Sequence, residues 1–136
     1  MAFNLSTLSL KETSIVHLTH PETGEKLYDN GDLKLPVQIE VYGTASKAYR
    51  NKLREIQNER MKINAKPGKA KTISVEKVEE NSIDLLVAAS IRGINIDYQG
   101  KPLEGETFRE LYNDISLDWV KTQVSDAVED VKAFLV

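Results

Sequence analysis

The spacing of apolar residues changes at Gly43, and this change limits the possible fold more than any other property of the chain. Before Gly43, residues 14–20 and 35–42 alternate between apolar and polar side chains and are rich in β-branched residues, which is typical of half-buried strands. After Gly43, apolar residues recur at steps of three and four, the spacing of a helical face. We therefore expect an α+β fold, mainly helical, with a small N-terminal antiparallel sheet of two to three strands followed by three to four helices.

The β-rich part is expected over residues 13–43, behind an extended arm formed by residues 1–12. Pro21 and Gly24 supply turn chemistry after the first strand, and the pair Asn30-Gly31 supplies a second turn. Between these turns, residues 27–28 read as a short return strand. The prediction is a meander of three strands at most.

The helical part is expected over residues 44–136, which completes a single domain covering residues 1–136. Its first helix runs from an N-cap at Thr44 to about Ile63, and a second runs from near Ser74, capped by Thr72 or Ser74, to a stop at Gly93. A flexible basic loop is expected near residues 64–72, because Pro67-Gly68 interrupts a lysine-rich stretch. A short helix is expected over residues 106–112.

One apolar stripe marks the terminal helix, which is expected from about residue 117 to residue 134. Its members are Leu117, Val120, Val124, Ala127, Val131 and Phe134. A stripe this narrow usually docks on its own domain, and the same spacing also suits a second copy or a partner helix. No residue able to do chemistry lies on the stripe, so this helix is expected to pack and not to catalyse.

Composition excludes several classes of protein. Of the residues, 40% are hydrophobic and 29% are charged, as in a soluble globular protein. The absence of cysteine excludes disulfides, thiolate metal sites and cysteine nucleophiles. The first residues lack the pattern of a signal peptide, and no apolar stretch approaches the roughly 18 residues of a membrane span. We expect a cytoplasmic protein with no membrane partner.

Charge is strongly segregated along the chain, although the net charge is only −3. Residues 44–72 hold nine basic residues against two acidic ones, whereas residues 104–136 hold eight acidic residues against three basic ones. Opposite charge at two ends of one small domain favours head-to-tail self-association or docking on a charged partner. The alternative is a solvated helix face that is simply basic.

The sequence offers little to a catalytic interpretation. The two histidines, His17 and His20, would lie on opposite faces of a strand, so a shared metal is not expected. No nucleophile elbow, phosphate-binding glycine loop or dinucleotide fingerprint is present. Glu79, Glu80 and Asp84 fit a solvated helix face better than a pair of catalytic carboxylates. The residues therefore predict a non-enzymatic binding module with no catalytic residue, no metal site and no cofactor.

Four pieces of sequence, taken in order, resemble the tail assembly chaperones of long-tailed bacteriophages. The first is the turn at residues 21–25, and the second is the segment 41–50, in which a strand, a glycine and a Tyr49-Arg50 pair lead into a basic helix. The third combines the helix at 85–93 with the Gly-Lys-Pro turn at 100–102. The fourth is Leu111-Tyr112 followed by Trp119, Gln123-Val124 and Phe134. One departure is that many relatives carry a Trp where this chain has Ile94 or Ile96.

The resemblance implies a chaperone that binds the tape measure protein and helps recruit major tail tube protein subunits during tail morphogenesis. It also implies self-association, a location in the host cell cytoplasm and absence from the mature virion. A tape measure helix carries a repeating apolar stripe, which such a protein would cover through an apolar groove. The expected protein-binding residues are Tyr49, Arg50 and Arg54 on the basic helix and Trp119, Val120, Val124, Val128 and Phe134 on the terminal helix. Core packing is the alternative for each of them.

Two other classes of function stay open at this point. One is a structural minor tail protein or tail-tube-associated protein that is retained in the virion. The other is a small nucleic-acid-binding protein that uses the basic segment 47–71. Nucleic acid is the less expected partner, because Tyr49 is the only aromatic residue in that segment.

Overall fold

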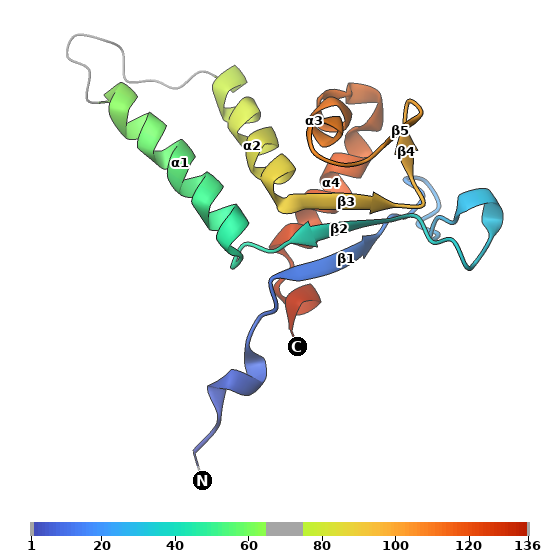
Figure 1. Ribbon diagram of the computed structural model, residues 1–136, viewed down its shortest axis with the longest axis horizontal. Helices are drawn as coiled ribbons and strands as arrows, with labels where there is room; N and C mark the ends of the chain where they lie inside the picture. Colours follow the sequence, from blue (N-terminus) through green and yellow to red (C-terminus); the bar gives the residue numbers. More distant parts are fainter. Residues whose placement is uncertain (1, 65–74, 136) are drawn as a thin grey trace.

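The computed structural model describes residues 2–64 and 75–135, and these form the predicted α+β fold (Figure 1). The predicted basic loop at 64–72 and both candidate caps of the second helix, Thr72 and Ser74, fall almost entirely outside the described residues. Four α-helices are present in the described part: α1 (Lys47–Asn64), α2 (Val75–Ala89), α3 (Glu106–Asn113) and α4 (Asp118–Glu129). The prediction of a mainly helical chain with a small antiparallel sheet is confirmed.

The sheet contains β1 (Thr13–His17), β2 (Gln38–Tyr42) and β3 (Ser90–Ile94), with β2 in the centre and both pairings antiparallel. The third strand corrects the sequence prediction, which placed residues 90–93 at the end of a helix. The chain instead passes directly from α2 into β3. Gly93 lies inside this strand. A Cβ at this position would be only 2.6 Å from Ile96 Cγ2 and 2.8 Å from Leu103 Cβ. Close packing, and not helix termination, is thus the role of this glycine.

The expected return strand at residues 27–28 does not join the sheet. Instead, Thr19 and Lys26 form one isolated bridge, and Tyr28 and Pro36 form another. Leu27 still hydrogen-bonds on both sides, because its N–H donates to the Leu18 carbonyl and its carbonyl accepts from the Val37 N–H, each at 3.0 Å. The turns around it, including one 3-10 turn at Asp29–Gly31, interrupt the ladder before a strand can form.

Helix α1 begins later than the sequence predicted, because Ser46 and not Thr44 caps it. The Ser46 hydroxyl accepts from the Tyr49 N–H at 3.2 Å and donates to the Gly43 carbonyl at 2.7 Å. Both bonds are made by a fully buried side chain, so this cap also fixes the path from β2 into α1. The predicted end near Ile63 and the short helix over residues 106–112 are confirmed by α1 and α3.

The terminal helix is shorter than the apolar stripe suggested. Helix α4 ends at Glu129, and a 3-10 turn covers Val131–Phe134. The Asp130 carboxylate accepts from the Lys132 N–H at 3.1 Å, which stabilises the break. As a result Val131 is 55% exposed, whereas Phe134 turns inward against Gly43, where an added Cβ would lie 3.0 Å from its ring.

The core lies between the sheet and helices α2, α3 and α4 (Figure 1). Its buried members include Ile39 and Val41 from β2, Phe108 from α3, and Val120 and Val124 from α4. A small hairpin of β4 (Asp97–Tyr98) and β5 (Lys101–Pro102) precedes α3. A 3-10 turn at Ile115–Leu117 joins α3 to α4.

The expected arm is present and runs away from the body of the molecule (Figure 1). It contains a 3-10 turn, Leu5–Leu8, which Asn4 caps by accepting from the Ser6 N–H at 3.1 Å. The side chains of Phe3, Leu5 and Leu8 are exposed. The arm is anchored where the Lys11 N–H donates to the Phe134 carbonyl at 2.7 Å.

Candidate functional site: a groove between α1, α2 and α4

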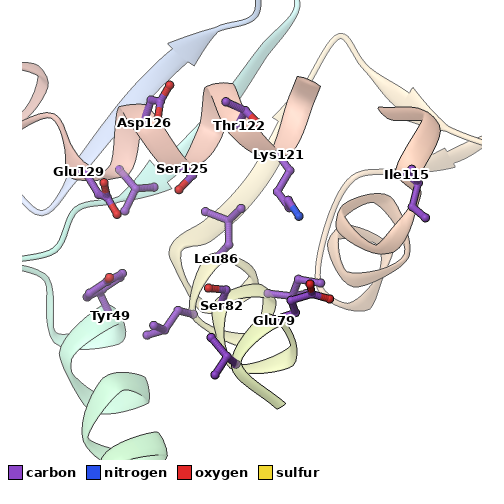
Figure 2. Close-up of a pocket in the computed structure, with 14 residues that line it drawn as sticks. Tyr49, Glu79, Ser82, Leu86, Ile115, Lys121, Thr122, Ser125, Asp126 and Glu129 are labelled. Carbon is purple, nitrogen blue, oxygen red and sulfur yellow. The ribbon is translucent and has the colours of Figure 1, made fainter. Parts of the chain in front are cut away.

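An open groove of about 610 Å³ lies between three helices (Figure 2). One wall is α2, which contributes Val78, Glu79, Ser82, Ile83, Leu85 and Leu86. The other wall is α4, which contributes Lys121, Thr122, Ser125, Asp126, Val128 and Glu129. Tyr49 of α1 and Ile115 of the turn before α4 complete the lining. The size is that of a site able to hold several apolar side chains of a ligand.

The apolar part of the groove follows from the spacing of residues on α2. Val78, Ser82 and Leu86 lie four residues apart, so they share one face of the helix. Leu86 and Val128 are buried and form the floor, whereas Val78 stays exposed near the rim. Ile115, which lines the groove from the turn before α4, is 90% exposed. A partner that filled the groove would also cover Ile115.

Carboxylates occupy both walls of the groove. Asp126 and Glu129 lie on α4, and Glu79 lies on α2 (Figure 2). None of these three forms an ion pair with another described residue. The one lysine of the lining, Lys121, is paired with Asp118 at 3.2 Å. The groove therefore combines an apolar floor with an acidic rim.

Tyr49 connects the groove to α1. Its side chain is partly buried against the core. Burial raises the pKa of the Tyr49 hydroxyl above its ordinary value, and the negative charge of Glu129 raises it further. The phenol is therefore neutral over the physiological range, and it presents a ring and a hydroxyl to the groove without adding a charge.

The structure separates the eight residues that the sequence singled out as protein-binding. Two of them, Tyr49 and Val128, meet in the groove. Arg50 and Arg54 are exposed on α1 and do not line it, and Trp119 is half-buried against the core. Val120, Val124 and Phe134 are buried and hold the fold together. In this conformation they are covered by the protein itself.

Most of the groove was not singled out by the sequence interpretation, although part of its signal was present. Val78, Leu85 and Leu86 recur at helical spacing in the sequence, but this spacing does not tell which of them stay uncovered. The exposure of Ile115 could not be predicted from the sequence, because it depends on the 3-10 turn between α3 and α4 that keeps this side chain in solvent.

The two histidines and the Asp84 carboxylate, which do not line the groove, form hydrogen bonds and an ion pair that hold the fold together. His17 Nε2 donates to the Leu27 carbonyl at 2.8 Å, and His20 Nδ1 accepts from the Glu22 N–H at 3.1 Å. Asp84 pairs with Arg109, which also bonds Glu106 at 2.8 Å. Within residues 2–64 and 75–135, no group of histidine and carboxylate side chains is arranged to hold a metal ion.

The buried Ser90–Tyr112 pair is structural as well, with its oxygens 2.6 Å apart. The Ser90 hydroxyl also donates to the Leu86 carbonyl at 2.7 Å, and its bond with Tyr112 joins the end of α2 to α3. Burial raises the pKa of the Tyr112 hydroxyl well above its ordinary value, so this phenol stays protonated.

Comparisons with protein-family models, with curated proteins and with solved structures found no match to this chain. Among the described helices, none has both the length and the apolar character needed to cross a membrane. The groove and the order of motifs in the sequence are therefore the observations on which a function can be proposed.

Proposed function

We propose that this protein is a non-enzymatic tail assembly chaperone of a long-tailed bacteriophage, which binds the tape measure protein and helps recruit tail tube subunits. The observation that carries the proposal is the open groove between α1, α2 and α4, with Leu86 and Val128 at its apolar floor. The sequence resemblance, which runs through the chain in the order of that family, supports the identity of the partner. The groove supports the mode of binding.

The mechanism is temporary coverage of apolar surface. A long helix with a repeating apolar stripe aggregates unless that stripe is buried. A groove between helices can accept such a stripe, because the apolar side chains of the partner helix recur every three or four residues and can contact the floor of the groove turn by turn. Leu86 and Val128 would contact the apolar anchors, and Ile115 would be covered as the partner docks.

Co-expression with the tape measure protein of the same phage tests the proposal. The partner should be recovered in the soluble fraction together with this protein, and a complex should survive gel filtration. Ser82→Trp should reduce recovery several-fold, because Ser82 is exposed in the wall of the groove and a larger side chain would fill it. Gln57→Trp, on the exposed face of α1, is the matched control and should have no effect.

Two further variants report on the aromatic residues predicted from the sequence. Tyr49→Ala should weaken the complex, because the ring lines the groove. Trp119 is the only tryptophan, so its fluorescence offers a direct signal of partner binding near α4. Failure of co-expression to improve solubility, together with the absence of a complex, would favour a structural tail component, and mass spectrometry of purified virions would then detect this chain.

The exposed basic face of α1 favours one second candidate, which is binding to nucleic acid. Lys47, Arg50 and Arg54 are all exposed and form no ion pair with any described residue. Contacts with phosphates would give an affinity for any duplex that falls steeply as salt rises. Arg50→Glu with Arg54→Glu should abolish such binding while leaving the groove intact, so gel-shift assays separate this function from the chaperone function.

A further inference from the structure

We infer that the groove selects a helix from another protein whose apolar stripe is flanked by lysine or arginine side chains. This inference rests on the proposed function and adds the chemical class of the bound segment. It follows from the position of the carboxylates relative to the apolar floor, and from the pairing of the basic residues nearby.

The carboxylates lie where the flanks of a docked helix would be. Asp126 and Glu129 are three residues apart on one wall, and Glu79 is on the wall across the floor (Figure 2). A helix about 10 Å in diameter that places its stripe on Leu86 and Val128 brings its flanking residues near both walls. Acidic flanks would meet carboxylates on each side, whereas basic flanks would meet opposite charge.

The lysine of the lining and the lysine one turn from Tyr49 are already paired. Lys121 is held by Asp118 at 3.2 Å, and Lys52, one turn from Tyr49 on α1, is held by Glu55 at 3.4 Å. Arg50 and Arg54 are exposed on α1 and are not among the residues that line the groove. The charges that remain available to a ligand in the groove are therefore the three carboxylates.

Helix α1 of a second copy of the chain does not offer an apolar stripe flanked by basic side chains. On α1, Ile56 is buried and Tyr49 packs against the core, so Met61 is the one large hydrophobic that α1 exposes among its described side chains. One exposed anchor does not make an apolar stripe. What remains exposed on α1 between Lys47 and Glu59 is mainly charged and amide side chains. The occupant is therefore a basic amphipathic helix of a different protein.

Two designed peptides of about 20 residues test the selectivity on the full chain. Both carry the same leucine stripe with helical spacing, one flanked by lysine and the other by glutamate. The lysine peptide should bind at least about tenfold more tightly at low salt, and the difference should shrink as ionic strength rises. Fluorescence anisotropy of labelled peptides gives both affinities.

Variants locate the effect. Asp126→Lys combined with Glu129→Lys should reverse the preference between the peptides. Glu22→Lys combined with Glu25→Lys makes the same change of net charge on an exposed turn and should leave the preference unchanged. Ser82→Trp should weaken the lysine peptide, because it fills the groove.

Three results would overturn the inference: equal affinity for both peptides, no binding of the lysine peptide, or an equal shift by the control pair. If co-expression with the tape measure protein still gave a soluble complex that Ser82→Trp weakens, the proposed function would stand and only the charge selectivity would fall. If co-expression also failed, both proposals would fall.

Discussion

Helices α1 and α4 are both amphipathic, but they are held in place by very different interactions. Along its 12 residues, α4 buries Val120, Val124 and Val128, each at most 4% exposed. Gln123 adds two hydrogen bonds to the backbone of Thr19, accepting at 2.9 Å and donating at 2.8 Å. Over its 18 residues, α1 buries Ile56, which lies outside the main core cluster.

The contact between α1 and α2 is also partly polar. Arg60 Nε and Asn81 Oδ1 are buried, and neither has a hydrogen-bond partner among the residues that the structure describes. An unpaired buried polar group costs free energy, so it offsets part of what Ile56 contributes. Of the helices that line the groove, α4 is therefore firmly held by the core, whereas α1, which contributes Tyr49, is held more weakly and can adjust to a partner.

The largest expected effect is that of Val124→Asp in α4. Val124 is completely buried, and an unpaired carboxylate there costs about 3–5 kcal/mol, a large part of the stability of a small domain. Thermal melting followed by circular dichroism should show loss of the cooperative transition or a melting temperature lowered by many degrees. Gln57→Asp on the exposed face of α1 is the control and should melt like the parent. A normal melt for Val124→Asp would show that α4 is not part of the cooperative core.

Ile56→Ala tests the weaker attachment of α1. Removal of its buried atoms should cost about 2 kcal/mol, and the loss should be confined largely to α1. Hydrogen exchange by mass spectrometry should show faster exchange in α1 and unchanged protection in β2 and α4. Val128→Ala, in the core cluster, should instead accelerate exchange throughout. Equal effects of both variants on every segment would mean that α1 and α4 unfold together.

Ser46→Ala tests how α1 is joined to the sheet. The variant loses the cap on Tyr49 and the bond to Gly43, at a cost of about 1–2 kcal/mol. Thr44→Ala removes the cap that the sequence favoured and should change the free energy of unfolding by less than about 0.5 kcal/mol. Chemical denaturation of both variants measures the difference. A larger effect at Thr44 would contradict the observed start of α1.

The smallest effect concerns the segment that leads into α4. The Asp114 carboxylate accepts from the Ser116 hydroxyl at 2.6 Å and from the Tyr98 hydroxyl at 2.8 Å. These bonds hold the pKa of Asp114 below its ordinary value, with the Ser116 side chain contributing most. A lowered folded-state pKa stabilises the fold at pH values above the ordinary range of an aspartate, and this contribution is lost as pH falls through the folded-state pKa.

Carboxyl NMR titration can therefore rank the two partners of Asp114. Tyr98→Phe should raise the pKa of Asp114 toward its ordinary value, and Ser116→Ala should raise it further. In both variants, the free energy of unfolding should fall less on acidification than it does in the parent. An unchanged pKa in Tyr98→Phe would mean that the hydroxyl bond to Asp114 does not form in solution.

Local patterns were sufficient for much of the fold and for little of the groove. The alternation at residues 35–42 and the three-four spacing after Gly43 correctly predicted β2 and α1, because both signals depend only on neighbours along the chain. Residues 90–93 were missed as part of a strand, since their pairing partner, β2, is about 50 positions away in sequence. The stripe over 117–134 likewise could not reveal that Asp130 ends α4 and that Phe134 turns back onto Gly43.

By itself, the sequence determined the class of fold, the segregation of charge and the amphipathic faces of the helices, because each follows from composition and period. The tertiary structure decided which apolar residues are covered. Val124 and Val78 both lie on apolar helical faces, yet the first is sealed against the sheet and the second stays exposed beside an acidic rim. Burial depends on what packs opposite a side chain, and that partner comes from a distant part of the chain.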